Sequence, residues 1–326
     1  MDKLSELYQN RVSRRNFLAG AGAVGATSVL AGCGSSTTTV PAVSGNKYTD
    51  ADILNFALNL EYLEAEFYLR AATGQGLAAS LTTGTGTPGT VTVGNATQVP
   101  GLTTGQQQTL NEIAYEEQQH VNFLRTTLGS AAVARPAIDL SFFGPLAVAA
   151  GIYTSSQPAF NPFASFDAFL IGAFIFEDVG VTAYSGAAGL ISAAGITAGL
   201  LNAAAGILAV EAYHAGYIRT AITARSVTLG TTAYITIANQ VAALRQALTV
   251  GTTPSIDSPS NSETNLVAPT ATTASAIVSA SSANAIGFAR TVNQVHHIVY
   301  GSATVGVAKG GFFPNGTNSI FATTTA

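Results

Sequence analysis

The sequence contains one cysteine and few charged side chains, and these scarcities exclude several classes of protein. A single cysteine excludes an intrachain disulfide framework, a zinc–thiolate site and an iron–sulfur cluster, so any bound metal must be held by oxygen and nitrogen. Only 9% of the 326 residues are charged whereas 47% are hydrophobic, which is the reverse of the composition of disordered chains. The net charge of −4 argues against binding to nucleic acid, which needs clustered positive charge.

Residues 1–33 have the pattern of a bacterial export signal. Arg14 and Arg15 form a twin-arginine motif, and the weakly hydrophobic run after them ends at Cys33 in the order Leu-Ala-Gly-Cys, which is typical of a lipoprotein cleavage site. We therefore expect the twin-arginine machinery to export the folded chain to the periplasmic side or the cell surface. Lipid on Cys33 would anchor it to a membrane, with residues 34–47 as a flexible tether. The alternative is an ordinary signal peptide with an incidental cysteine.

Four windows of the remaining chain are predicted to form helices that carry carboxylates on their apolar faces. Apolar residues recur there every three or four positions, and one glutamate lies in the middle of each stripe. In the second and fourth windows, a histidine follows that glutamate three residues later, and the spacing selects Glu117 rather than Glu116 as the inward residue. The inward polar residues are Glu61, Glu117, His120, Glu177, Glu211 and His214. Taken singly, each acid is better explained as a solvated surface residue and each histidine as a core residue.

The order of these residues along the chain is Glu, Glu-x-x-His, Glu, Glu-x-x-His, which indicates an internal repeat. Four carboxylates in a core are costly unless they are neutralised, and two divalent cations would balance their charge. The pattern predicts a di-iron or di-manganese site in a four-helix bundle, in which carboxylates bridge the metals and each histidine binds one. Tyr68 and Tyr184 each follow a first glutamate by seven residues. With Glu64, they are expected to contact the ligands without binding the metals.

Loops and crossings are predicted from glycine, proline and hydropathy. Residues 75–104 are expected to form an exposed loop with a short hairpin at residues 90–93, and a long crossover should join the second and third helices. The stretch from Gly186 to Val210 is apolar enough to raise a transmembrane span as an alternative. Its five glycines and the absence of flanking positive charge favour two core helices joined by a turn near Gly195.

The C-terminal extension, residues 227–326, is predicted to contain two further helices. Residues 233–248 and 289–301 have helical patterns, and a linker rich in serine, threonine and proline separates them. The second of these helices carries His296 and His297, which point about 100° apart on a helix. They are therefore expected to serve packing or to lie at the surface rather than to bind one metal together.

Residues 55–68, 176–184 and 311–316 resemble the ferritin-like domain proteins that include plant desiccation-related proteins and their exported bacterial relatives. The resemblance extends from about residue 48 to residue 318. It implies an all-α fold in which a ferritin-like four-helix bundle with a long crossover, residues 48–226, is followed by the extension. It also implies a di-metal centre with the ligands Glu61, Glu117, His120, Glu177, Glu211 and His214. The resemblance implies no particular reaction, because the activity of this family is poorly defined.

Two kinds of function follow from this interpretation. The first is redox chemistry on dioxygen, peroxide or ferrous iron in stress protection, by a ferroxidase-, peroxidase- or catalase-like centre of two divalent iron or manganese ions. The second is a stress-protective or interaction protein without catalysis, whose metal site is structural or vestigial. The ligands do not distinguish iron from manganese. The sequence also leaves open whether the chain forms a homo-oligomer.

Overall fold

The computed structural model describes residues 48–94, 98–154, 156, 159–251, 263, 265–268, 277–280 and 285–325. All of them belong to one compact unit, Lys47–Ala326. The predicted export signal with Arg14, Arg15 and Cys33, and the predicted tether, lie outside the described residues.

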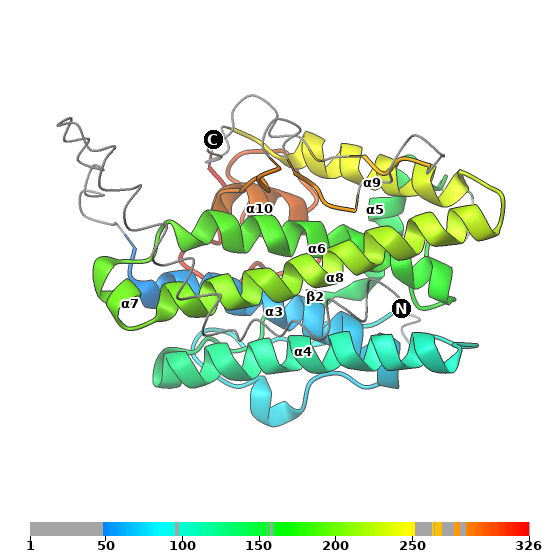
Figure 1. Cartoon of the computed structure of the whole chain (residues 1–326). Helices are drawn as coiled ribbons and strands as arrows, with labels where there is room; N and C mark the ends of the chain where they lie inside the picture. The colour runs from blue at the N-terminus through cyan, green and yellow to red at the C-terminus, as the bar shows by residue number, and fades with distance from the viewer. Residues whose placement is uncertain are drawn as a thin grey trace, which may run out of the picture. The chain divides into compact units, whose positions relative to one another are not determined.

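Four long helices form a bundle made of two helix pairs. Helix α3 (Asp50–Thr73) packs along α4 (Thr104–Leu128), and α6 (Phe166–Ala188) packs along α8 (Leu200–Thr228) (Figure 1). Between α4 and α6 the chain makes a long crossover that contains α5 (Phe143–Ala149). The all-α four-helix bundle with a long crossover expected from the sequence is thereby confirmed.

Local capping explains where the first two long helices begin and end. The Thr49 side chain accepts a hydrogen bond from the Asp52 amide (3.2 Å), and the Asp52 carboxylate accepts one from the Thr49 amide (2.9 Å), which satisfies two free donors of a helix start. Thr103 and Gln106 repeat this capping box at α4. Gly74 ends α3 in a left-handed conformation, with φ of 77°, which glycine adopts without steric cost.

Aromatic side chains fill the core at one end of the bundle. The Phe67 ring of α3 contacts the rings of Phe169 and Phe176 from α6, with centroids 5.6 and 5.5 Å apart. Phe312, near the C-terminus, packs on Phe143 and Phe176 with centroids 4.9 Å from each. The C-terminal residues therefore complete the bundle core and are not an appendage.

The C-terminal extension contains α9 (Ala233–Leu248) and α10 (Val292–Val299), which pack against each other and against α6 (Figure 1). Both helices confirm the sequence prediction. His296 and His297 of α10 are fully buried. The His296 ring stacks on Tyr300 with centroids 5.3 Å apart, and His297 Nδ1 lies 2.6 Å from the Ser302 carbonyl oxygen. Both histidines therefore serve packing.

One local prediction is wrong. Residues 90–93 do not form a hairpin: β1 (Val91–Thr92) pairs in parallel with β2 (Ile138–Asp139) from the crossover. Gly89 permits this approach, because a Cβ there would lie 2.0 Å from the Ala137 amide nitrogen. Single turns of 3-10 helix occur at Ala79–Leu81, Gly129–Ala131 and Leu140–Phe142.

Residues 189–199 join α6 to α8, as predicted for two core helices with a turn near Gly195. Gly195 itself lies inside a short helix of this connection, α7 (Ala193–Thr197). The Ser192 side chain caps this helix by accepting from the Gly195 amide (3.0 Å), and Asp50 of α3 accepts from the Ser192 amide (2.8 Å). The chain therefore turns before and after α7. Among the described residues, none of the helices combines the length and the apolar character that a membrane crossing requires.

Candidate metal centre

The structure brings the six predicted inward residues together in the interior of the bundle. Each of the four long helices contributes, and all six side chains are buried. They form two groups whose candidate ligand atoms lie within 4.8 Å of one another. The first group contains Glu61, Glu117, His120 and Glu211, and the second contains Glu117, Glu177 and His214.

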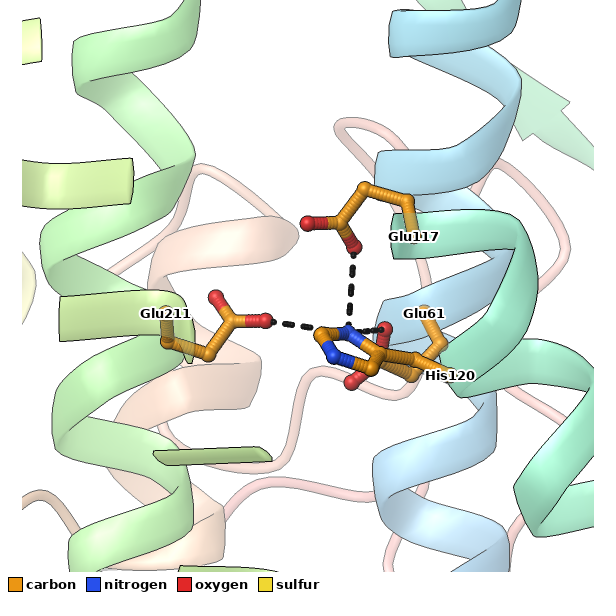
Figure 2. Close-up of side chains that lie close together, drawn as sticks. All are labelled: Glu61, Glu117, His120 and Glu211. Atoms are coloured by element: carbon orange, nitrogen blue, oxygen red, sulfur yellow. Dashed lines mark hydrogen bonds and ion pairs between the residues drawn. The ribbon is translucent and has the colours of Figure 1, made fainter. Parts of the chain in front are cut away.

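In the first group, three carboxylates surround one histidine nitrogen (Figure 2). His120 Nδ1 lies 3.2 Å from Glu61 Oε2, 3.5 Å from Glu211 Oε1 and 3.7 Å from Glu117 Oε2. The i,i+3 spacing on α4 places Glu117 and His120 on one face of that helix. Three helices therefore direct oxygen and nitrogen atoms at one point.

In the second group, His214 of α8 takes the corresponding position. Its Nδ1 lies 3.1 Å from Glu117 Oε1 and 3.5 Å from Glu177 Oε2. Glu117 thus directs one oxygen at each histidine and belongs to both groups. This is the arrangement that a carboxylate bridging two cations requires.

Two tyrosines connect the helix pairs crosswise. The Tyr68 hydroxyl of α3 donates a hydrogen bond to Glu177 of α6, and the Tyr184 hydroxyl of α6 donates one to Glu61 of α3. Each tyrosine therefore restrains the glutamate of the other half of the repeat. All four side chains are buried, so these bonds fix the orientation of two carboxylates away from solvent.

Glu116 is part of the site, and sequence reasoning missed it. His214 Nε2 lies 2.7 Å from Glu116 Oε2, and the Glu116 side chain is 34% exposed. The apolar stripe correctly selects Glu117 for the interior. The stripe does not indicate a role for Glu116, because this residue lies at the edge of α4 and contacts a histidine of another helix.

Several buried atoms of the site lack hydrogen-bond partners among the described residues. They are both carboxylate oxygens of Glu117 and of Glu211, Oε2 of Glu177, and Nδ1 of His214. Unpaired buried carboxylates are strongly destabilising unless a cation or a proton neutralises them. Carboxylate oxygen and imidazole nitrogen are donors that suit iron and manganese. The residues present therefore fit a pair of such ions.

Burial and mutual repulsion shift the protonation of the metal-free site. Burial raises the pKa of Glu61 and Glu177, and burial with repulsion from Glu117 raises the pKa of Glu211 well above its usual range. Burial also raises the pKa of Glu117, but the neighbouring His120 and His214 outweigh this and lower that pKa to about 2. The pKa of each histidine is raised, because the surrounding carboxylates outweigh burial. Cations must therefore displace protons from the site.

Comparisons with known proteins agree with this geometry. The family model described as Ferritin-like domain matches residues 49–224. A desiccation-related protein, PCC13-62, of Craterostigma plantagineum is 30% identical over 205 residues, which are 61% of this chain and 62% of that protein. The ferritin-like catalase Nec2 of Nesocodon mauritianus is 31% identical over 149 residues, which are 44% of this chain and 45% of that protein. The chain thus spans less than two thirds of the length of either relative.

Proposed function

Because the chain belongs to the ferritin-like domain family, we propose that its buried cluster binds two divalent ions, iron or manganese, and decomposes hydrogen peroxide. The observation that carries the proposal is the position of Glu117, which directs one unpaired oxygen toward each of two histidine-containing groups. A similarity to a protein named ferritin-like catalase supports peroxide as the substrate. The role would be stress protection, which the similarity to a desiccation-related protein also supports.

Each residue has a distinct task in this proposal. Glu61, His120 and Glu211 would hold one ion, Glu177 and His214 would hold the other, and Glu117 would supply an oxygen to each. Such a pair of ions, when bound, exchanges electrons with an O–O bond. The hydroxyls of Tyr68 and Tyr184 keep the outer carboxylates in place.

A groove between α4 and α8 gives a small substrate a route to the centre. It has a volume of about 320 Å³ and is lined by Glu116, Tyr213, His214 and Tyr217, among others. His214 faces this groove and also belongs to the second ligand group. The groove is ample for peroxide.

Oxygen release from peroxide tests the proposal. Protein loaded with Mn²⁺ or Fe²⁺ and freed of excess metal is expected to release one O₂ for every two H₂O₂ consumed, with many turnovers per chain. The Glu117→Gln variant, treated identically, is the control for free metal. If the loaded protein consumes no peroxide but oxidises ferrous iron with turnover, the centre is a ferroxidase. If it does neither, the non-catalytic alternative replaces the proposal.

We also propose that the chain is exported and anchored by lipid on Cys33. The twin-arginine pair and the Leu-Ala-Gly-Cys order support this. A Cys33→Ala variant is expected to move from the membrane fraction to the soluble exported fraction. Retention of the variant in membranes, with unchanged processing, would contradict the lipid anchor.

A further inference from the structure

Glu64 is a buried carboxylate that is not among the six ligands of the proposed centre. It lies on α3, one helical turn after Glu61, and is only 5% exposed. Among the residues that the structure describes, its carboxylate has no hydrogen-bond or ion-pair partner. Buried acids outside the centre are paired: Glu66 of the same helix, for example, forms ion pairs with Arg70 and Arg135. An isolated buried carboxylate is costly, so its position requires an explanation.

Glu64 follows Glu61 by three residues, which is the spacing between the two ligands on α4 and on α8. Helices α4 and α8 each carry a glutamate and a histidine three residues apart, and α3 carries Glu61 and Glu64 at the same spacing. On α6 the corresponding residue after Glu177 is Gly180. Side chains at i and i+3 share one helix face. Three helices therefore present a second donor toward the centre, and the fourth presents none.

Gly180 leaves the space into which Glu64 and Glu211 both extend. A Cβ at Gly180 would lie 2.3 Å from Glu211 Oε2 and 3.6 Å from Glu64 Oε1. The two carboxylates thus approach the same point beside α6. Since Glu211 belongs to the group around His120, Glu64 lies beside that group.

Beside Glu64 is a small cavity. The cavity has a volume of about 10 Å³, which is room for about one water molecule. Apart from Glu64, its lining residues carry no charge, and they include Phe176, Val179 and Phe312. A carboxylate in such surroundings gains most by turning toward a cation.

From these observations we infer that Glu64 is a seventh metal ligand, which joins Glu61, His120 and Glu211 at one of the two ions. The inference rests on the proposed di-metal centre and makes that centre asymmetric. The ion beside His120 would have five protein residues around it, whereas the ion beside His214 would have three, with Glu117 counted in both. The two sites should then differ in affinity, and the difference should depend on Glu64.

Titration of metal-free protein with Mn²⁺, followed by calorimetry and by the electron paramagnetic resonance of free Mn²⁺, tests this inference. Wild type is expected to bind two ions with unequal affinities. Glu64→Gln keeps the size of the side chain but removes its charge, and is expected to weaken the tighter site at least about tenfold while the other stays within about twofold. Glu66→Gln is the matched control, because it removes a buried carboxylate of the same helix that faces arginines. Its two affinities should equal those of wild type.

Two other results of the titration would overturn the assignment of Glu64. Unchanged affinities in Glu64→Gln would show that the carboxylate is not a ligand. An equal loss at both sites would show a general effect of charge. If Glu64→Gln does not fold, the position of the carboxylate in crystals of Mn²⁺-loaded wild type decides: bonded to an ion, it supports the inference, and turned into its cavity, it refutes it. If wild type binds no metal, the di-metal proposal itself fails.

Discussion

The Glu117→Gln variant is expected to lose both metal ions, whereas Glu177→Gln is expected to lose only one. Glu117 supplies an oxygen to each ligand group, and Glu177 belongs to the second group alone. The amide keeps the size of the side chain but has no charge and only one oxygen to offer. The measurement is the number of metal ions per chain, by elemental analysis after loading with Mn²⁺ and desalting. We expect values near two for wild type, one for Glu177→Gln and zero for Glu117→Gln.

The two variants control for each other, because both remove one buried carboxylate from the same cluster. Circular dichroism of each verifies that the helices remain. Equal losses in the two variants would contradict the position of Glu117 between two ions. Two ions retained in Glu117→Gln would exclude this residue as a ligand.

Removal of metal is expected to lower the melting temperature by more than about 10 °C at pH 8. A ligand present at a thousandfold excess over its dissociation constant stabilises the folded state by about 4 kcal/mol per site. One kcal/mol shifts the melting temperature of a large domain by about 2–4 °C. Scanning calorimetry with and without a chelator measures the difference.

The effect of the chelator should increase with pH. Burial raises the pKa of Glu61, Glu177 and Glu211 above the ordinary 4.5, so protonation stabilises the metal-free fold fully below pH 4.5. This stabilisation is lost as the pH rises through the raised pKa values. The pKa values of His120 and His214 are also raised, so these histidines likewise make the metal-free fold less stable as the pH rises above their ordinary pKa of 6.5. Glu117, whose pKa is lowered to about 2, has the opposite effect on the stability of the metal-free fold, but only below pH 4.5.

A variant with all six ligands replaced by apolar residues of similar size separates the contribution of the metals to stability from the contribution of core packing. It should melt at a temperature that the chelator does not change, because the six ligands and their buried charges are gone. A single Glu177→Ala change should be more destabilising, since it leaves unbalanced carboxylates in the core. If the melting temperature of wild type is indifferent to the chelator, then the metals do not support the fold.

The sequence predicts the inward residues because their signal is local. Periodicity places Glu61, Glu117 and Glu211 on apolar stripes, and these stripes pack into the core. The contribution of Glu116 was not predictable, since it depends on how α4 and α8 approach each other. The parallel pairing of Val91 with Ile138 was missed for the same reason, because partners so far apart in the chain leave no local pattern.

Buried charge away from the centre was also beyond sequence reasoning. Asp178 follows Glu177 directly, yet its carboxylate pairs with Arg219 (2.9 Å) and Arg245 (3.0 Å) from α8 and α9. Glu263 joins Arg245 to Arg290. Each of these residues looks like a surface charge in its own segment. Only the packing of α9 and the C-terminal residues on α6 makes them a buried network.

Anomalous diffraction from crystals of the Mn²⁺-loaded protein is the most direct test of the central claim that the bundle holds two ions. The account predicts two peaks, one among Glu61, His120 and Glu211 and one between Glu177 and His214, with Glu117 bonded to both. A single peak, no peak, or peaks outside the cluster in fully loaded protein would contradict it.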